Sequence, residues 1–326
     1  MPVAMLKTDV MKDAVRLACR APSLYNRQPW RWVADREQLQ LFLDPGRVTL
    51  ADRSHREALI GCGAVLDHLR VAMAAAGWEA HVDRFPSLNE PNHLATITFT
   101  PMDHVTANHR RRANAILLRR TDRLPFKPPT RWQSFEPLLY SSTDGGTVHL
   151  DVMSDDVRPQ LIEAYQIAES LRLYDSQYHT ELGWWTAPFE VSEGIPYSCL
   201  PTAAESERVD VRRVFPVTHH SERRTEVPED YAKVLVLSTD GDGRAEALAS
   251  GEALSAVLLE CTMAGLATCT LTYLTEVRVT RDLVAALLDY DCQPQVVVRV
   301  GVAPATEELP PLTPRRALND VLRVRT

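Results

Sequence analysis

A helical pattern that occurs twice constrains the fold of this 326-residue chain more than any other feature of its sequence. Setting Gly63 against Gly251 aligns the two copies without a gap. Corresponding positions are apolar or glycine in both copies: Leu66 and Leu254, Leu69 and Val257, Met73 and Cys261, Gly77 and Gly265. Helical spacing that ends at a glycine predicts an amphipathic helix with a glycine C-cap. The repeat therefore predicts a duplicated unit, each copy built on one long helix.

Strand patterns on either side of these helices support the duplication. Residues 39–43 alternate apolar and polar side chains, and residues 94–100 are rich in β-branched and aromatic residues. Residues 295–300 form an apolar run that suits a sheet buried on both faces. We expect an α+β fold with a first half at residues 1–108 and a second half at residues 109–326. Two related halves create a crevice between them, where ligand sites commonly form.

Charge and cysteine content exclude several classes of protein. The net charge of -7 argues against nucleic acid as the main partner, because phosphate backbones are bound by basic faces. The sequence shows neither a continuous apolar run of membrane-spanning length nor a signal-peptide core, so we expect a cytoplasmic protein with no membrane partner. The six cysteines form no C-x-x-C pair, and we expect reduced packing thiols and no metal site.

An arginine-rich segment lies near the middle of the chain. Arg119, Arg120 and Arg123, with the hydroxyl of Thr121, follow an apolar-periodic helix. Guanidinium forks suit the geometry of a phosphate. The alternative is a solvated helix end, where arginine offsets the dipole of the last carbonyls. A position between the two halves favours the phosphate site.

A polar loop follows the first helix, which we expect around residues 10–18. Pro22 and Pro29 prevent a regular helix, so residues 21–32 should form a fixed loop that presents Ser23, Asn26 and Gln28. Polar groups beside tryptophans suit a flat heteroaromatic ligand. The alternative is an N-cap serine and a turn asparagine next to core tryptophans.

Together these segments carry a resemblance to FMN-dependent nitroreductases. Residues 119–126 resemble the R-R-S-x-R-x-F element of that family, and residues 21–30 resemble its A-P-S-x-x-N-x-Q-P-W element. The helix of residues 251–266 and the basic tail Pro314-Arg315-Arg316 resemble two further elements. More narrowly, residues 184–190, 251–270 and 313–316 resemble the Acg family of actinobacterial proteins, which are nitroreductase-like chains with two fused halves.

The resemblance implies a nitroreductase fold in which both halves form an intramolecular pseudo-dimer. Nitroreductases are usually homodimers with FMN at the interface. In this chain the residues implied for the phosphate and ribityl chain are Arg119, Arg120, Thr121 and Arg123, together with Arg315 or Arg316. Those implied for the isoalloxazine ring are Pro22, Ser23 and Asn26. The first half lacks an R-R-S-x-R element and the second lacks a P-S-x-x-N loop, so we expect one flavin per chain.

Residues 174–228 are the part of the second half that the duplication does not explain. Trp184 and Trp185 could fold over a flavin as part of a lid, or they could pack between the halves. With an opening lid, the resemblance implies hydride transfer from NAD(P)H through FMN to an oxidised acceptor such as a nitroaromatic or quinone. With a closed lid, the protein would sequester flavin. A third alternative is a structural or nucleic-acid-interacting protein that uses the basic helix of residues 109–123.

Other sequence features contribute less to the function. No side chain stands out as a general acid or base, and none is assigned a catalytic role. Residues 241–243 read as a turn between a strand and a helix. Thr280 is a candidate N-cap of a late surface helix.

Overall fold

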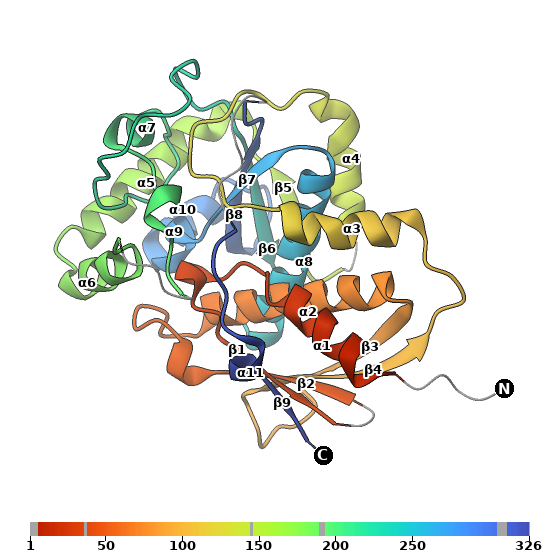
Figure 1. Cartoon of the computed structure of the whole chain (residues 1–326). Helices are drawn as coiled ribbons and strands as arrows, with labels where there is room; N and C mark the ends of the chain where they lie inside the picture. Colours follow the sequence, from red (N-terminus) through yellow and green to blue (C-terminus); the bar gives the residue numbers. More distant parts are fainter. Residues whose placement is uncertain (1–5, 36–37, 144–145, 189–192, 305–311, 326) are drawn as a thin grey trace.

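The computed structural model describes residues 6–35, 38–143, 146–188, 193–304 and 312–325. Two β-sheets organise the chain (Figure 1). The first sheet has the order β3-β4-β2-β1-β9 and the second has the order β5-β6-β8-β7. The strands of the first sheet are β1 (Trp30–Ala34), β2 (Gln38–Leu43), β3 (Trp78–Arg84), β4 (His93–Pro101) and β9 (Leu322–Val324). Those of the second are β5 (His149–Val152), β6 (Lys233–Thr239), β7 (Ala267–Leu271) and β8 (Gln293–Gly301).

The two sheets share one topology over four strands. The order β3-β4-β2-β1 in the first sheet corresponds to β7-β8-β6-β5 in the second, and every one of these pairings is antiparallel. Even a register shift recurs, between Leu41 and Phe42 in β2 and between Leu237 and Ser238 in β6. The fifth strand of the first sheet, β9, comes from the C-terminal tail and pairs parallel with β1. The tail thus returns to the N-terminal sheet.

The repeated helices cross each other at the repeated glycines. They are α2 (Arg56–Ala75) and α8 (Arg244–Met263). A Cβ atom on Gly63 would lie 1.9 Å from the carbonyl oxygen of Leu248, and one on Gly251 would lie 2.0 Å from that of Ile60. Only glycine permits so close an approach of two helix backbones. The C-cap residues are Ala76 and Ala264, and the predicted glycines follow them directly, with φ angles of +88° at Gly77 and +74° at Gly265. A glycine in this left-handed conformation ends each helix, one position later than predicted.

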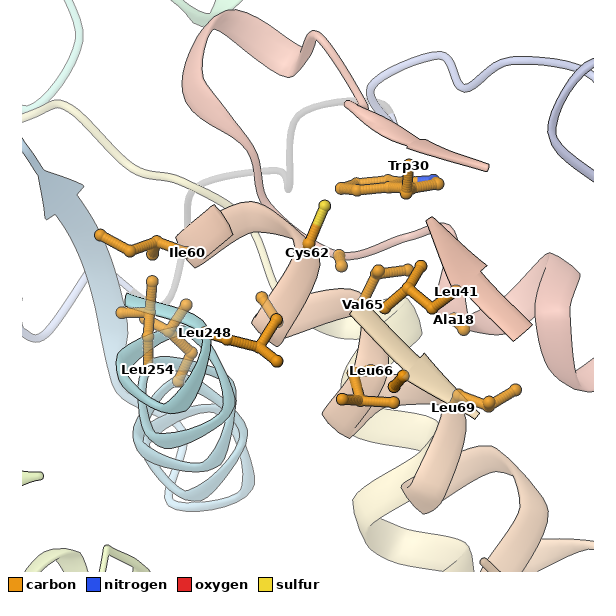
Figure 2. Close-up of a cluster of buried hydrophobic side chains, with 14 of the residues drawn as sticks. Ala18, Trp30, Leu41, Ile60, Cys62, Val65, Leu66, Leu69, Leu248 and Leu254 are labelled. Carbon is orange, nitrogen blue, oxygen red and sulfur yellow. The ribbon is translucent and has the colours of Figure 1, made fainter. Parts of the chain in front are cut away.

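The main core lies around α2 and joins both sheets. Figure 2 shows Cys62 of α2 pointing toward Trp30 of β1, while Ile60 faces α8. A second core covers the other face of the second sheet, between β6, β7 and β8 and the helices packed on them. The apolar run in β8 is accordingly buried on both sides, as predicted. Each Å² of apolar surface that these strands bury contributes roughly 25 cal/mol to the free energy of folding, and this burial stabilises both sheets.

The remaining helices surround these layers. They are α1 (Thr8–Ala18), α3 (Ala107–Leu118), α4 (Trp132–Ser142), α5 (Arg158–Arg172), α6 (Ser176–Trp185), α7 (Ala203–Glu207), α9 (Tyr273–Glu276), α10 (Arg278–Ala285) and α11 (Leu318–Val321). The predicted first helix is confirmed as α1. The turn predicted for residues 241–243 lies between β6 and α8, where it was expected.

Two local predictions are wrong. The loop predicted to extend to Trp32 ends earlier, because β1 begins at Trp30 and buries Trp30 and Trp32 while Arg31 points to solvent. Thr280 does not cap a helix, since it lies inside α10. Its buried hydroxyl donates to the carbonyl oxygens of Leu274 and Val277 at 2.9 and 3.0 Å.

Within the described residues, one helix, α2, has the length and hydropathy of a membrane span. Most of that apolar stretch, 83%, is buried inside the fold, which is what a core helix requires. The six cysteines are free. Across the described ranges, no group of three or more histidine, cysteine, aspartate or glutamate side chains could hold a metal ion.

Candidate functional site

Two adjoining cavities bring together most of the residues singled out by the sequence. The first, here called the arginine cavity, is lined by Pro22, Ser23, Asn26, Arg119, Arg120, Thr121, Arg123 and Arg315, among others. The second, here called the apolar cavity, adds Ile60, Gly61, Phe215, Leu254 and Leu271, among others. The residues that line both cavities are Pro22, Ser23, Tyr25, Thr121, Arg123 and Ile195. A charged compartment therefore borders an apolar one. Their walls come from the loop after α1, from α2 and α8, from the segment after α3 and from the C-terminal tail.

The end of α3 positions the central arginines. Arg119 is the C-cap residue, and its ψ angle of 133° turns the chain away from the helix. The next residues reach β7, where Thr121 forms a bridge with Thr268 and the amide of Asp122 donates to the carbonyl of Thr268 at 2.9 Å. Arg120 donates to the carbonyls of Leu117 and Leu118 at 2.8 and 3.0 Å. Arg120 thus hydrogen-bonds the free carbonyls at the C-terminal end of α3 and also lines the cavity.

Arg20, Arg119 and Arg315 have no carboxylate partner among the residues that the structure describes. Burial, together with the neighbouring guanidinium groups of Arg20 and Arg120, lowers the pKa of Arg119 to about 10. Burial, and then the guanidinium groups of Arg20, Arg119 and Arg120, hold the pKa of Arg315 well below its usual range. The Nε atoms of Arg20 and Arg119 are buried without a hydrogen-bond partner. Crowded cations with unsatisfied donors are expected where an anion binds, because an anion would supply both charge and acceptors.

The two tail arginines have different environments. Arg315 donates through Nε to the carbonyl of Cys19 and through Nη2 to that of Arg20, both at 3.0 Å, and it faces the arginine cavity. Arg316 instead donates to the carbonyls of Gln28 and Asp320, at 3.2 and 2.9 Å. Of the two alternatives left by the sequence, only Arg315 lines either cavity.

The loop after α1 is held in an unusual conformation. Tyr25, Asn26 and Gln28 all have positive φ angles, of 48°, 56° and 52°. Such backbone strain in residues other than glycine is characteristic of functional sites. The Ser23 hydroxyl accepts a bond from the Gln28 amide at 2.9 Å, and Asn26 Nδ2 donates to the carbonyl of Pro314 at 3.0 Å. The buried Oδ1 of Asn26 has no donor. The loop is thus tied to the C-terminal tail and retains an unsatisfied acceptor beside the cavity.

The segment predicted as a lid does line the cavities, but through other residues than the tryptophans. Trp184 is 62% exposed, and neither Trp184 nor Trp185 lines the arginine cavity or the apolar cavity. The guanidinium of Arg27 lies over the Trp185 ring, 4.1 Å from its centre. The wall of the arginine cavity is formed by Gly194, Ile195, Pro196 and Cys199, and that of the apolar cavity includes Ile195, Arg213 and Phe215. Residues 189–192 of the predicted lid lie outside the described residues.

Three charged residues at the site were missed by the sequence reasoning. Arg20 joins the arginine cavity directly after α1. Arg213 is buried and reaches the hydroxyl of Tyr25 at 2.8 Å, while also pairing with Glu276. Glu57, in the first turn of α2, lines the apolar cavity. None of the three residues stands in a motif that marks it as functional, and only the tertiary fold brings each of them to the site.

Similarity to known proteins extends over the whole chain. No protein-family model matches it. It is 60% identical over 326 residues to "Putative NAD(P)H nitroreductase acg" of Mycobacterium tuberculosis, covering 100% of this chain and 98% of that protein. It is 53% identical over 321 residues to "Uncharacterized protein Rv3127" of the same organism, covering 97% and 93%. Among solved structures, the FMN-dependent nitroreductase NfnB from Mycobacterium smegmatis in complex with NADPH is 16% identical, with a TM-score of 0.41 over 67% of this chain and 99% of that chain. With 60% identity to Acg across its full length, the protein belongs to the Acg family of nitroreductase-like proteins.

Proposed function

We propose that the chain is an FMN-binding oxidoreductase that passes hydride from NAD(P)H through FMN to a small oxidised acceptor, such as a nitroaromatic or a quinone. The observation that carries the proposal is the cluster of the buried Arg119 and the half-buried Arg20 and Arg315, which lies beside an apolar cavity. None of the three pairs with a carboxylate among the described residues. Membership of the Acg family, whose relative in Mycobacterium tuberculosis is named "Putative NAD(P)H nitroreductase acg", supports this chemistry.

The residues present fit the two ends of FMN. Two buried Nε donors without acceptors, on Arg20 and Arg119, match the oxygens of a phosphate. We assign the phosphate and ribityl chain to Arg119, Arg120, Thr121, Arg123 and Arg315, with Arg20 added. We assign contact with the isoalloxazine ring to Pro22, Ser23 and Asn26. The unsatisfied Oδ1 of Asn26 is an acceptor for a ring N–H.

The protein's own side chains would bind, orient and shield the reactants. Bound FMN supplies the hydride chemistry, while the protein determines which reactant meets it. Ile60, Leu254 and Phe215 give the apolar cavity walls that exclude water. Exclusion of water strengthens every charge interaction at the neighbouring arginines.

We further propose that residues 1–108 and 109–326 are duplicated halves that form one pseudo-dimer with one flavin. The shared strand order of the two sheets supports this, as does the fact that α2 and α8 are both 20 residues long. The close crossing at Gly63 and Gly251 places the helix contact at matched positions of the repeat. The arginine segment occurs after the first copy of the helix, and the Ser23 loop occurs before it. One flavin per chain follows from this single pair of elements.

Sequestration of flavin is the second candidate, and the covering segment favours it. Gly194, Ile195, Pro196, Cys199 and Phe215 line one or both of the two cavities, which measure only about 80 and 100 Å³. Arg213 fastens this segment by donating to the hydroxyls of Tyr25 and Thr272, at 2.8 and 3.4 Å, and by pairing with Glu276. Exchange of a nicotinamide donor for an acceptor requires this segment to move.

An anaerobic visible spectrum of the FMN-loaded chain separates the two candidates. NADPH or NADH should bleach the flavin band, and a nitroaromatic or quinone added next should restore it. Flavin that only dithionite reduces would overturn the reductase and support sequestration. A chain that retains no flavin after desalting, while its fold is intact by circular dichroism, would overturn both.

A further inference from the structure

Glu57 lies in the wall between the apolar cavity and a third, larger cavity. This outer cavity has a volume of about 580 Å³ and lies near the N-terminal end of α2. Glu57 lines both cavities although only 6% of it is exposed. Its neighbour Asp52 lines the outer cavity and is 5% exposed. A carboxyl group that reaches two compartments is placed to connect them.

Asp52 and Glu57 are both buried and both line the outer cavity, and hydrogen bonding by the Asp52 carboxyl contributes to the raised pKa of Glu57. Asp52 Oδ2 accepts a bond from the amide of Ala58 at 2.9 Å, which leaves its buried Oδ1 without a donor. Arg56 donates to Glu57 Oε1. Two carboxylates in contact in a buried site cannot both ionise without a large cost, whereas one shared proton joins them. That proton would also satisfy the orphaned Oδ1 of Asp52.

The surrounding charges match a pair that carries one negative charge. Arg56 is fixed opposite Glu57 by the carbonyls of Gln295 and Thr275, at 2.9 and 2.6 Å. Burial, and then the Asp52 carboxyl, raises the pKa of Glu57 well above its usual range, although Arg56 opposes this. Glu276 on α9 adds to the rise, and it stays ionised because Arg213 and Thr272 hold its own pKa down. The other charged groups around the outer cavity are Arg53, Asp240, Asp242, Arg278, Arg281 and Asp282.

We propose that Asp52 and Glu57 share one proton and deliver it from the outer cavity to the acceptor that is reduced in the apolar cavity. The delivery step rests on the proposed function. The acceptor gains a hydride that originates from NAD(P)H, and its charged oxygen or nitrogen then bonds the proton of Glu57. The Glu57 O–H bond breaks, and its electron pair remains on the carboxylate. Water in the outer cavity returns a proton to the pair through Asp52. Glu57 is thereby the general acid that the sequence did not reveal.

The shared proton is tested on the full chain without any ligand. Infrared spectra of protein with 13C-labelled glutamate should show one protonated glutamic acid at neutral pH, and Glu57→Gln should remove its band. Asp52→Asn should move the titration of that band to lower pH, because the neighbouring negative charge is gone. Asp67→Asn is the matched control on α2, since Asp67 is equally buried but bonds to Ser255 at 2.6 Å and lines neither the apolar nor the outer cavity. Absence of any glutamic acid band that depends on Glu57 would overturn the shared proton.

The delivery step is tested on FMN-loaded protein by stopped-flow reduction of a quinone. Glu57→Gln should lower the rate of acceptor reduction about 100-fold and flatten its pH profile, as expected for loss of a general acid. Flavin affinity should be unchanged, and Asp67→Asn should react at the wild-type rate. Wild-type rates in Glu57→Gln would overturn delivery while leaving the reductase intact. If neither nucleotide reduces the wild-type flavin, the reductase and the delivery step fall together, and the infrared band still decides whether the proton is shared.

Discussion

Buried arginines occur in two regions of this molecule with opposite electrostatic settings. Near the C-terminal end of β8, Arg299 forms a bidentate salt bridge with Asp230. Nη2 lies 2.7 Å from Oδ1, and Nε lies 2.8 Å from Oδ2. Arg158 donates to Asp210 nearby at 2.6 Å. The pKa of Arg299 is raised by the Asp230 carboxylate despite burial, whereas burial and like charges lower that of Arg119. The ion pairs of the first region are thus formed within the chain, whereas the arginines of the second pair with no carboxylate among the described residues.

The bonds in the arginine cavity orient the guanidinium groups without neutralising them. Arg315 and Arg20 donate to backbone carbonyls, for example from Arg20 Nη1 to Thr313 at 2.9 Å. A carbonyl dipole satisfies a donor but supplies no net charge, so repulsion among Arg20, Arg119 and Arg315 persists. The environment of a buried arginine, and not its burial, therefore distinguishes a structural ion pair from a candidate anion site.

The largest expected effect comes from breaking the complete region. Asp230→Ala should lower the free energy of unfolding by about 3–5 kcal/mol, because it leaves buried guanidinium charge without a partner. It also removes the acceptor of the Phe126 amide, which bonds to Asp230 at 2.8 Å. Urea unfolding followed by circular dichroism measures the change. Asp13→Ala is the control, since its pairing with Arg16 lies on the surface and its loss should leave the unfolding free energy almost unchanged. A loss as small as that of the control would remove the distinction between the regions.

The next effect comes from completing the other region with an anion. FMN at 100 times its dissociation constant should raise the free energy of unfolding by about 2.7 kcal/mol. Thermal unfolding with increasing FMN measures this shift. Riboflavin, which has the ring but no phosphate, is the matched ligand and should stabilise the chain far less. Equal stabilisation by both ligands would place the binding energy in the apolar cavity and not at the arginines.

The sequence predicted those parts of the fold that local patterns determine, and missed parts that depend on contacts between distant segments. The α2 and α8 repeat was recognisable because helical spacing and a closing glycine are local patterns, and the same alignment included the crossing glycines. The strand β9 was missed because three residues carry too short an alternation, and it pairs with a strand from the opposite end of the chain. Trp30, Arg31 and Trp32 alternate as a strand should, but the preceding proline-containing loop obscured them.

The candidate site follows the same rule. Ser23, Asn26, Arg119, Thr121 and Arg123 were identified because they stand in compact motifs, and the structure brings them to one cavity. Glu57 and Arg213 could not be identified in this way. Acidic residues are common in the first turn of a helix, so Glu57 carries no special signal. Its meeting with Asp52 depends on tertiary packing, as does that of Arg213 with Tyr25.

Removing one cavity arginine should weaken binding without weakening the fold. Arg119→Met should lower FMN affinity about 30-fold, which corresponds to roughly 2 kcal/mol for a charged hydrogen bond. Titration of flavin fluorescence measures the affinity. Arg316→Met is the matched control, because Arg316 follows Arg315 in the sequence but faces Gln28 and Asp320. Equal affinities in both variants would remove Arg119 from the site.

The smallest expected effect concerns pH, and its sign separates the two regions. Burial and the neighbouring guanidinium groups lower the pKa of Arg119 in the folded chain to about 10, so its charge opposes folding at neutral pH. This penalty is fully present below about pH 10 and is lost as the pH rises above that value toward the pKa of an exposed arginine. Without phosphate or flavin, Arg119→Met should therefore be more stable than wild type at pH 8, by on the order of 1 kcal/mol. The advantage should shrink by pH 11 in paired urea titrations, where other titrating groups cancel in the difference. Saturating FMN should abolish the advantage, because the phosphate supplies the missing charge.

Arg299→Met should instead be less stable than wild type throughout this pH range, since a raised pKa keeps Arg299 charged and its bond with Asp230 intact. A destabilised Arg119→Met chain in anion-free buffer at pH 8 would show that both arginine groups are structural.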